Sequence, residues 1–198
     1  MGSRRPAPPF GLTNPGYITM DAADGIVVAR IDGSERHVLV AKDGESISPI
    51  WSRDGLHLAF WHRDAAGSPW SLVVVDQDAT GRRVLVEDIT LREREDSLNQ
   101  PSNISWSPDS DRMVYAADTP SGSAIFVASR TGGGVTRITD PSLKAIDPAW
   151  APDGSTIVFV SSACTLVLEL VAGHAAGELG RERVRFRRLG GLAGLDPS

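Results

Sequence analysis

The sequence has few of the residues that build covalent or metal-held frameworks. It contains one cysteine, Cys164, and four histidines in 198 residues. One cysteine excludes an internal disulfide and a multi-cysteine zinc module. No two histidines stand at a His-x-His or His-x-x-x-His spacing, which would present two ligands on one face. We therefore expect no metal and no cofactor. The histidines are His37, His57, His62 and His174.

Long apolar runs and an excess of positive charge are also lacking. No window reaches the roughly 18 apolar residues that a membrane-spanning helix needs. Lys and Arg number 20 against 25 Asp and Glu, a net charge of -5, which argues against nucleic acid as a partner. Residues 1–16 are rich in proline and lack the apolar stretch of a secretory signal. We expect them to be a disordered lead-in and the protein to be cytoplasmic, or periplasmic or extracytoplasmic if an earlier N-terminal segment is missing.

Three segments of the chain repeat one pattern around a tryptophan. They read PIWSRDGLHLAF from Pro49, ISWSPDSDRMVY from Ile104 and PAWAPDGSTIVF from Pro148. Residues of the Ser-Pro-Asp-Gly type form a tight turn, because proline fixes φ, aspartate bonds its own backbone and glycine tolerates positive φ. Each segment is therefore predicted to be a strand, a turn and a strand. The structural residues of the repeat are Trp51, Asp54, Gly55, Trp106, Asp109, Trp150, Asp153 and Gly154.

A second predicted hairpin recurs in a common register. The separations from Ile26 to Val40, from Leu72 to Val86 and from Ile125 to Thr139 are all 14 residues. One repeat is thus four strands, and the tryptophan spacings of 55 and 44 residues suit a propeller blade of roughly 40 to 50 residues. Continuously apolar strands are typical of sheets covered on both faces, as blades are. A β-sandwich is the alternative, but it predicts strict in-out alternation and no common register.

This pattern resembles the TolB-like, WD-repeat-like β-propeller repeat over residues 18–168. The Trp-Ser-Pro-Asp-Gly turn, the Ile-Val-Phe-type strand after it and the later Arg-Ile-Thr strand carry the resemblance. Arg53 replaces the expected proline, Ser110 the glycine and Ala151 the serine. The resemblance implies an all-β propeller of about three to four four-stranded blades in an incomplete ring. It also implies partners that are proteins or peptides.

The repeats divide the chain into predicted blades and a tail. Residues 172–180 read AGHAAGELG, which cannot form an apolar strand, so the pattern breaks near Cys164. Residues 183–189, RVRFRRL, are a candidate for a displaced fourth strand. An open ring leaves strand edges that invite self-association. The predicted parts are a propeller over 17–172, with a partial blade at 17–46, blades at 47–100 and 101–144 and an incomplete blade at 145–172, then a divergent basic tail at 173–198.

Two surface features are candidate contacts for a partner. The link from Val86 to Trp106 is nine residues longer than the link from Val40 to Trp51. Long loops on rigid β scaffolds often carry function, although a solvated insertion also explains the extra length. A pair of tryptophans brackets another predicted loop, where exposed rings would anchor a partner and buried rings would pack against a neighbouring blade. The candidate contacts are Arg92, Glu93, Arg94 and Glu95 in the long link, and Trp61 and Trp70 around the other loop.

The sequence shows no catalytic motif. The Gly-x-Ser-x-Gly elbow of prolyl-oligopeptidase-type peptidases, which carry TolB-like propellers, is absent. The turn aspartates have the chemistry to meet a cation, but turn formation accounts for them. We therefore predict a non-catalytic scaffold for protein-protein or protein-peptide interaction. The alternative is the gating propeller of such a peptidase without its catalytic domain.

Overall fold

The computed structural model describes most of the repeat region. It describes residues 17–91 and 104–161, and the backbone of residues 165–170 and 184–188. The predicted lead-in, residues 1–16, lies outside the described residues. The candidate contacts Arg92, Glu93, Arg94 and Glu95 lie outside them too.

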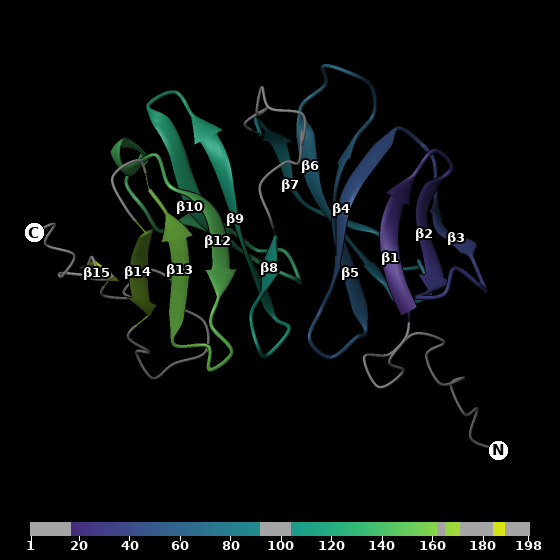
Figure 1. The fold of residues 1–198 in the computed structure, drawn as a ribbon. Coiled ribbons are helices and arrows are strands. Elements are labelled where there is room, and N and C mark those ends of the chain that lie inside the picture. The colour runs from purple at the N-terminus through teal and green to yellow at the C-terminus, as the bar shows by residue number, and fades with distance from the viewer. Residues whose placement is uncertain (1–16, 92–103, 162–164, 171–183, 189–198) are drawn as a thin grey trace, which may run out of the picture.

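Four antiparallel sheets follow one another along the chain, and we number them blades 1 to 4 (Figure 1). Blade 1 contains β1 (Tyr17–Ala22), β2 (Gly25–Arg30) and β3 (His37–Ala41). Blade 2 contains β4 (Glu45–Trp51), β5 (His57–Arg63), β6 (Trp70–Asp76) and β7 (Arg83–Ile89). Blade 3 contains β8 (Ser105–Trp106), β9 (Arg112–Thr119), β10 (Gly122–Ser129) and β11 (Val135–Arg137). Blade 4 contains β12 (Ile146–Trp150), β13 (Thr156–Val160), β14 (Thr165–Leu170) and β15 (Val184–Arg188).

The blades stand side by side in an arc that does not close, with blade 1 and blade 4 at its two ends (Figure 1). Within each sheet the strands are ordered as they are in the chain. The predicted fold class, an all-β propeller with an incomplete ring, is confirmed. The described part of the chain contains one short 3₁₀ helix, η1 (Pro141–Leu143), and no helix long and apolar enough to cross a membrane.

Strand pairing in the blades follows the 14-residue register of the sequence. Ile26 pairs with Val40 and Leu72 pairs with Val86. In blade 3 the backbone N–H of Ile125 donates to the side-chain hydroxyl of Thr139 at 2.8 Å. The threonine hydroxyl thus takes the place of a ladder carbonyl, since β11 ends two residues before it.

The repeat turns join the first and second strands of blades 2, 3 and 4. Gly55, Ser110 and Gly154 occupy the same turn position, with φ of 70°, 62° and 76°. Glycine adopts these values without strain, whereas Ser110 carries a Cβ in the left-handed region. Its hydroxyl compensates, because it accepts a hydrogen bond from the backbone N–H of Asp54 in the preceding blade at 3.0 Å.

The turn aspartates are held by hydrogen bonds from their own turns. Burial acts to raise the pKa of Asp54, but hydrogen bonds from the Ser52 hydroxyl and the Leu56 backbone outweigh it, so this pKa lies below its ordinary value. The same balance holds at Asp109. Burial acts to raise its pKa, but hydrogen bonds from the Ser107 hydroxyl and the Asp111 backbone lower it by more, so this pKa also lies below its ordinary value. Both carboxylates therefore stabilise the folded state in their charged form.

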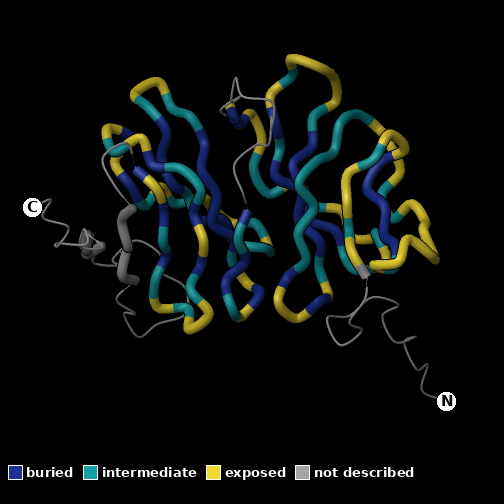
Figure 2. Tube along the Cα trace, in the orientation of Figure 1, coloured by how far each residue is buried: buried dark blue, intermediate teal, exposed yellow. Residues whose placement is uncertain are grey.

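The hydrophobic core consists of the layers between neighbouring blades (Figure 2). Leu58 and Phe60 of β5 pack towards Ile26 of blade 1. The other face of blade 2 meets blade 3, where the rings of Trp61 and Tyr115 lie edge to face with centroids 5.5 Å apart. Because both faces of β5, β6, β9 and β10 are covered, these strands are apolar along most of their length.

Blade 4 differs from the incomplete blade expected over residues 145–172. A fourth strand, β15, pairs with β14 from Val184 to Arg188, inside the segment predicted to be a basic tail. Its sequence, VRFRR, alternates apolar and charged side chains at first, the pattern of a strand with one solvated face. The displaced fourth strand is the interpretation that the structure supports.

Candidate functional site

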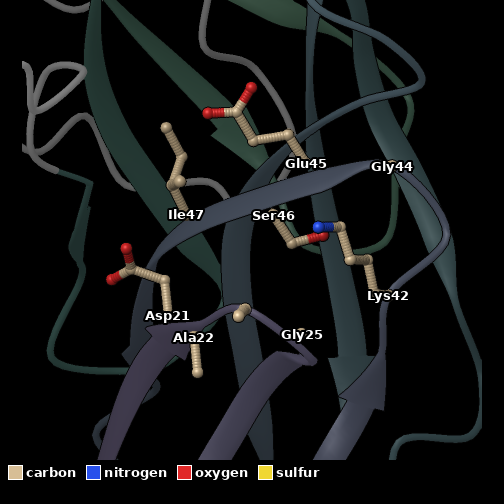
Figure 3. Close-up of a pocket in the computed structure, with 9 residues that line it drawn as sticks. Asp21, Ala22, Gly25, Lys42, Gly44, Glu45, Ser46 and Ile47 are labelled. Carbon is tan, nitrogen blue, oxygen red and sulfur yellow. The ribbon is translucent and has the colours of Figure 1, made fainter.

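A pocket of about 480 Å³ opens between blade 1 and blade 2 (Figure 3). Its walls come from the turn between β1 and β2, the link between β3 and β4, and the start of β4. The volume lies within the roughly 300–1,000 Å³ range of small-ligand pockets. The lining residues are Asp21, Ala22, Ala23, Gly25, Lys42, Gly44, Glu45, Ser46 and Ile47.

The pocket lies at one end of the blades, which we call the pocket end. Antiparallel strands place the end of β1 and the start of β4 there. β7, which is followed by the long link with the candidate contacts, ends at this end of the blades, because Ile89 pairs with Trp70, the first residue of β6. The repeat turns with Asp54, Asp109 and Asp153 lie at the opposite ends of the strands. The turn aspartates are therefore not part of the pocket.

At the pocket, a short polar side chain stands where the next junction has an indole. Asp21 pairs with Ile26, and Trp61 pairs with Leu72. Ile26 and Leu72 are themselves equivalent by the 14-residue register, so Asp21 is the counterpart of Trp61. Trp61 is fully buried and fills the space between blades 2 and 3. A carboxylate fills far less of it, and the space between blades 1 and 2 stays open.

Two glycines shape the pocket wall. A Cβ on Gly25 would lie 2.1 Å from the carbonyl oxygen of Val40, and one on Gly44 would lie 2.4 Å from that of Arg63. Both glycines also have positive φ, 124° and 154°. Any side chain at either position would force the backbone apart, so the sequence keeps the two strand connections close and the pocket border narrow.

The lining offers charges of both signs. Glu45 is held by Arg63, whose Nη2 lies 2.6 Å from a Glu45 carboxylate oxygen. Within the described parts of the chain, neither Asp21 nor Lys42 makes an ion pair with another side chain. Figure 3 shows these two charged groups at the border of the pocket. The site therefore presents one ammonium and one carboxylate to a ligand.

A histidine lies behind the pocket wall. His62 is 5% exposed, and its Nδ1 lies 3.0 Å from the Ser46 hydroxyl oxygen, on the strand directly opposite. Carboxylate oxygens of Asp43 and Asp64 lie 3.7 and 3.4 Å from its two ring nitrogens. A catalytic serine needs a base oriented by a third group in a water-excluded site. The Asp64 side chain is 92% exposed, so this third group is not shielded from water. The contact between Ser46 and His62 joins β4 to β5.

The predicted tryptophan contacts do not form a surface. Trp61 is 0% and Trp70 is 7% exposed, and the Arg63 guanidinium lies 4.4 Å from the centroid of the Trp70 ring. The expectation that these rings anchor a partner is wrong, because blade 3 covers one and Arg63 covers the other. Packing, the other interpretation of the pair, is what the structure shows.

Sequence reasoning missed the pocket residues Asp21, Lys42 and Ser46. The equivalence of Asp21 and Trp61 was hard to see because the two hairpins have turns of different length. Asp21 stands five residues before its partner Ile26, whereas Trp61 stands eleven before Leu72. If blades 1 and 2 are aligned on Ile26 and Leu72, the strand that precedes each of them can be paired with it residue by residue. That pairing sets Asp21 of blade 1 beside Trp61 of blade 2.

Metal binding has no support from the described residues, where no group of three His, Cys, Asp or Glu side chains is placed to hold an ion. His57, one of the candidates weighed from the sequence, instead faces Asp76, with 3.2 Å between Nδ1 and a carboxylate oxygen.

Comparison with known proteins places the chain among propellers. It is similar in fold to TolB from Acinetobacter baumannii, with a TM-score of 0.61 and 19% identity over 88% of this chain and 41% of that one. An oligogalacturonate lyase in complex with manganese has a TM-score of 0.55 and 18% identity over 75% of this chain and 42% of that one. A chain of a nidogen/laminin complex has a TM-score of 0.52 and 16% identity over 78% of this chain and 54% of that one.

These likenesses concern the fold, and the chain spans only 41% to 54% of the length of the three proteins. The sequence comparison is more specific. A family model described as the TolB beta propeller domain matches residues 16–164, which covers the repeats and the whole pocket. The chain belongs to the TolB beta propeller domain family.

Proposed function

We propose that the chain is a non-enzymatic propeller that binds a segment of another polypeptide in the pocket between blades 1 and 2. The observation that carries the proposal is the exchange of Asp21 for the indole of Trp61 at equivalent positions. A cavity lies beside Asp21 at one blade junction, whereas Trp61 is fully buried at the next. The blades hold this opening rigidly, as loop-built sites on β scaffolds require.

The pocket has the chemistry of a peptide site. Asp21 and Lys42 offer one charge of each sign, which suits a segment that carries a basic and an acidic group. β4 is the edge strand of blade 2 and borders the pocket from Glu45 to Ile47. An edge strand has backbone N–H and C=O groups that can pair with an extended peptide.

The comparisons support a binding function without specifying it. One of the similar structures is a complex of nidogen with laminin, and another is a lyase. The catalytic arrangement that comes nearest in the described residues is Ser46 with His62 and Asp64, and the exposure of Asp64 argues against it. A scaffold is therefore the function that the pocket favours.

The experiment selects ligands from a displayed library of random short peptides and measures the Kd of the enriched peptides by fluorescence anisotropy. Lys42→Glu reverses the charge at the pocket. Arg137→Glu makes the same change at an exposed position on β11 in blade 3 and is the matched control. We expect Lys42→Glu to weaken binding by about tenfold, or about 1.4 kcal/mol, and the control to leave it unchanged.

Three results would overturn the proposal: no enriched peptide, equal losses in both variants, or cleavage of a bound peptide by the wild-type chain. Thermal unfolding of both variants checks that they fold, since both positions are exposed and neither belongs to the core.

A further inference from the structure

Blade 1 has three strands, whereas blades 2, 3 and 4 have four each. The strand that it lacks is the first one. Met20 pairs with Val27 as Phe60 pairs with Val73, so β1 is the counterpart of β5, the second strand of blade 2. In blade 2 the first strand, β4, pairs with β5. Among the described residues, no strand occupies the corresponding edge of β1.

The exposure of blade 1 is concentrated at this edge. Ile18 is 41% and Met20 is 38% exposed, whereas their counterparts in β5 are fully buried. The residues of β2 from Gly25 to Ala29 are all buried. Figure 2 shows this change from an exposed β1 to a buried β2. The faces of blade 1 are therefore covered one strand further in, and it is the edge of β1 opposite β2 that lacks a neighbour.

The repeat tryptophan of blade 2 is less covered than the others. Trp106 and Trp150 are 2% and 4% exposed, but Trp51 is only half-buried. The indole Nε1 of Trp106 donates to the carbonyl oxygen of Ile50 at 3.2 Å. The backbone N–H of Trp150 donates to the Ser105 hydroxyl at 2.9 Å. Each acceptor lies on the first strand of the preceding blade, and the described part of blade 1 offers Trp51 no such strand.

The chain directly before β1 carries a weakened copy of the repeat. Without a gap, PFGLTNPGYITM from Pro9 aligns with PIWSRDGLHLAF from Pro49 and with PAWAPDGSTIVF from Pro148. The alignment sets Met20 on Phe60, the same equivalence that strand pairing gives independently. Residues 9–13 therefore stand in the sequence where the other blades have the end of their first strand and the start of the turn.

The turn of this copy has a different chemistry. Asn14 stands at the position of Asp54, and asparagine bonds its own backbone in a turn as aspartate does. Pro15 stands at the position of Gly55, whose φ of 70° is closed to proline. Pro15 followed by Gly16 suits a type II turn instead, with proline at its second position and glycine at its third. The sequence can therefore still reverse the chain directly before β1.

We propose that residues 9–13 form the first strand of blade 1, antiparallel to β1 on the edge opposite β2. A segment tethered this closely has an effective concentration at the edge that a separate polypeptide does not reach. Phe10 takes the position of Ile50 and gives Trp51 its neighbour. Gly11 takes the position of the repeat tryptophan, whose indole in blade 3 meets the preceding blade. Part of the predicted lead-in thus belongs to the propeller, and this inference does not rest on the peptide binding proposed for the pocket.

The backbone N–H of Thr19 reports on the proposed strand. In blade 2 the N–H of Ser52 donates to the carbonyl oxygen of His57 at 2.8 Å, so His57 turns its backbone groups towards β4. Pairs of this kind alternate along an antiparallel ladder, so Ala59 turns its groups the same way. Thr19 is the counterpart of Ala59. Its N–H therefore points to the proposed strand, whereas the N–H groups of the residues on either side point to β2.

The first test is hydrogen exchange of the backbone amides in the full chain, followed by NMR at two protein concentrations. We expect the Thr19 amide to exchange at least about tenfold more slowly than an unstructured amide. Replacing residues 9–13 with Gly-Ser-Gly-Ser-Gly should remove this protection. The amides of Ile18 and Met20 should stay slow and show that blade 1 still folds. The same replacement at residues 3–7 is the matched control and should leave Thr19 protected.

The second test needs no variant. Nuclear Overhauser contacts between residues 9–13 and the indole of Trp51 are expected in the wild-type chain, and their absence would overturn the proposal. A Thr19 amide that exchanges as fast as an unstructured one would do the same. Protection that survives the replacement of residues 9–13 also contradicts the proposal. Protection found only at the higher concentration would mean that a second copy supplies the strand, and the proposal would again be wrong.

Discussion

The indole Nε1 of Trp106 donates a hydrogen bond to the carbonyl oxygen of Ile50, 3.2 Å away in the preceding blade. The bond joins the innermost strands of blades 2 and 3, β4 and β8. Trp106 is 2% exposed, so the repeat tryptophan fills the interblade layer and also bonds to the backbone of the preceding blade. Packing and polar contact are provided by one side chain.

Trp106→Ala should therefore lower the free energy of unfolding by about 3 to 5 kcal/mol, the usual cost of removing a buried tryptophan. Trp106→Phe keeps most of the ring and loses the hydrogen bond, so a loss closer to about 1 kcal/mol is expected for that bond. Urea unfolding followed by circular dichroism measures both. Val84→Ala on the exposed outer strand serves as the control, and a loss below about 1 kcal/mol for Trp106→Ala would contradict the core role.

Two variants at Ser110 distinguish the effect of backbone strain on stability from the effect of the hydrogen bond. Ser110→Ala keeps the Cβ at φ 62° and loses the bond to the Asp54 N–H, so we expect a loss of about 1 kcal/mol. Ser110→Gly loses the same bond but relieves the left-handed strain, by about 1 kcal/mol, and should stay close to the wild type. Thermal or urea unfolding of the two variants side by side gives the comparison. If glycine were the less stable of the two, the strain argument would be wrong.

Acid should unfold this protein partly through its turn aspartates. The pKa values of Asp54 and Asp109 lie below the ordinary value of 3.8 in the folded state, so the folded state binds fewer protons than the unfolded state near that pH. Their contribution to stability is full above the unfolded pKa and is lost as pH falls through the folded one. Urea unfolding measured from neutral pH down to acid should show this decline, and Asp109→Asn should make it shallower. A stability that stays constant below pH 3.8 would refute the assignment.

Asp21→Trp should close the pocket. The register places the new ring opposite Phe60, as Trp61 stands opposite Tyr115 at the next junction. Burying part of the indole is expected to raise the free energy of unfolding by about 1 kcal/mol and to abolish binding of pocket-selected peptides. Asp64→Trp adds the same ring at a side chain that is 92% exposed, and we expect it to change neither quantity. Undiminished peptide binding by Asp21→Trp would place the ligand elsewhere.

Much of the fold was predictable because its signals are local. The turn residues between the first and second strands and the 14-residue register of the third and fourth strands lie close together in the chain, so their pattern survives in the sequence. Blade 4 was harder, because the chain between β14 and β15 is longer than in the other blades and the fourth strand stands out of register. Its alternation of valine, arginine and phenylalanine was visible, but only pairing with β14 identifies it as part of the sheet.

The candidate site was poorly predictable. Tryptophans at the ends of a loop are equally consistent with an exposed anchor and a buried wedge, and the neighbouring blade decides between them. Trp61 is buried by Tyr115 and its neighbours, more than 50 residues along the chain. The pocket depends on the same kind of long-range relation, since Asp21 matters only through the space that it leaves against β4.

By itself, the sequence determined the strands, their turns, the order in which they pair and the family, because each depends on residues within one repeat. Tertiary structure alone decided which faces are covered, that Trp61 and Trp70 are core residues, and that the junction at Asp21 stays open. Those outcomes depend on contacts between repeats, where the volume of one side chain is matched against a partner some 40 to 55 positions away. The local sequence pattern predicts the strands and turns of one blade. Only the packing between blades decides which side chains remain exposed and where a pocket forms.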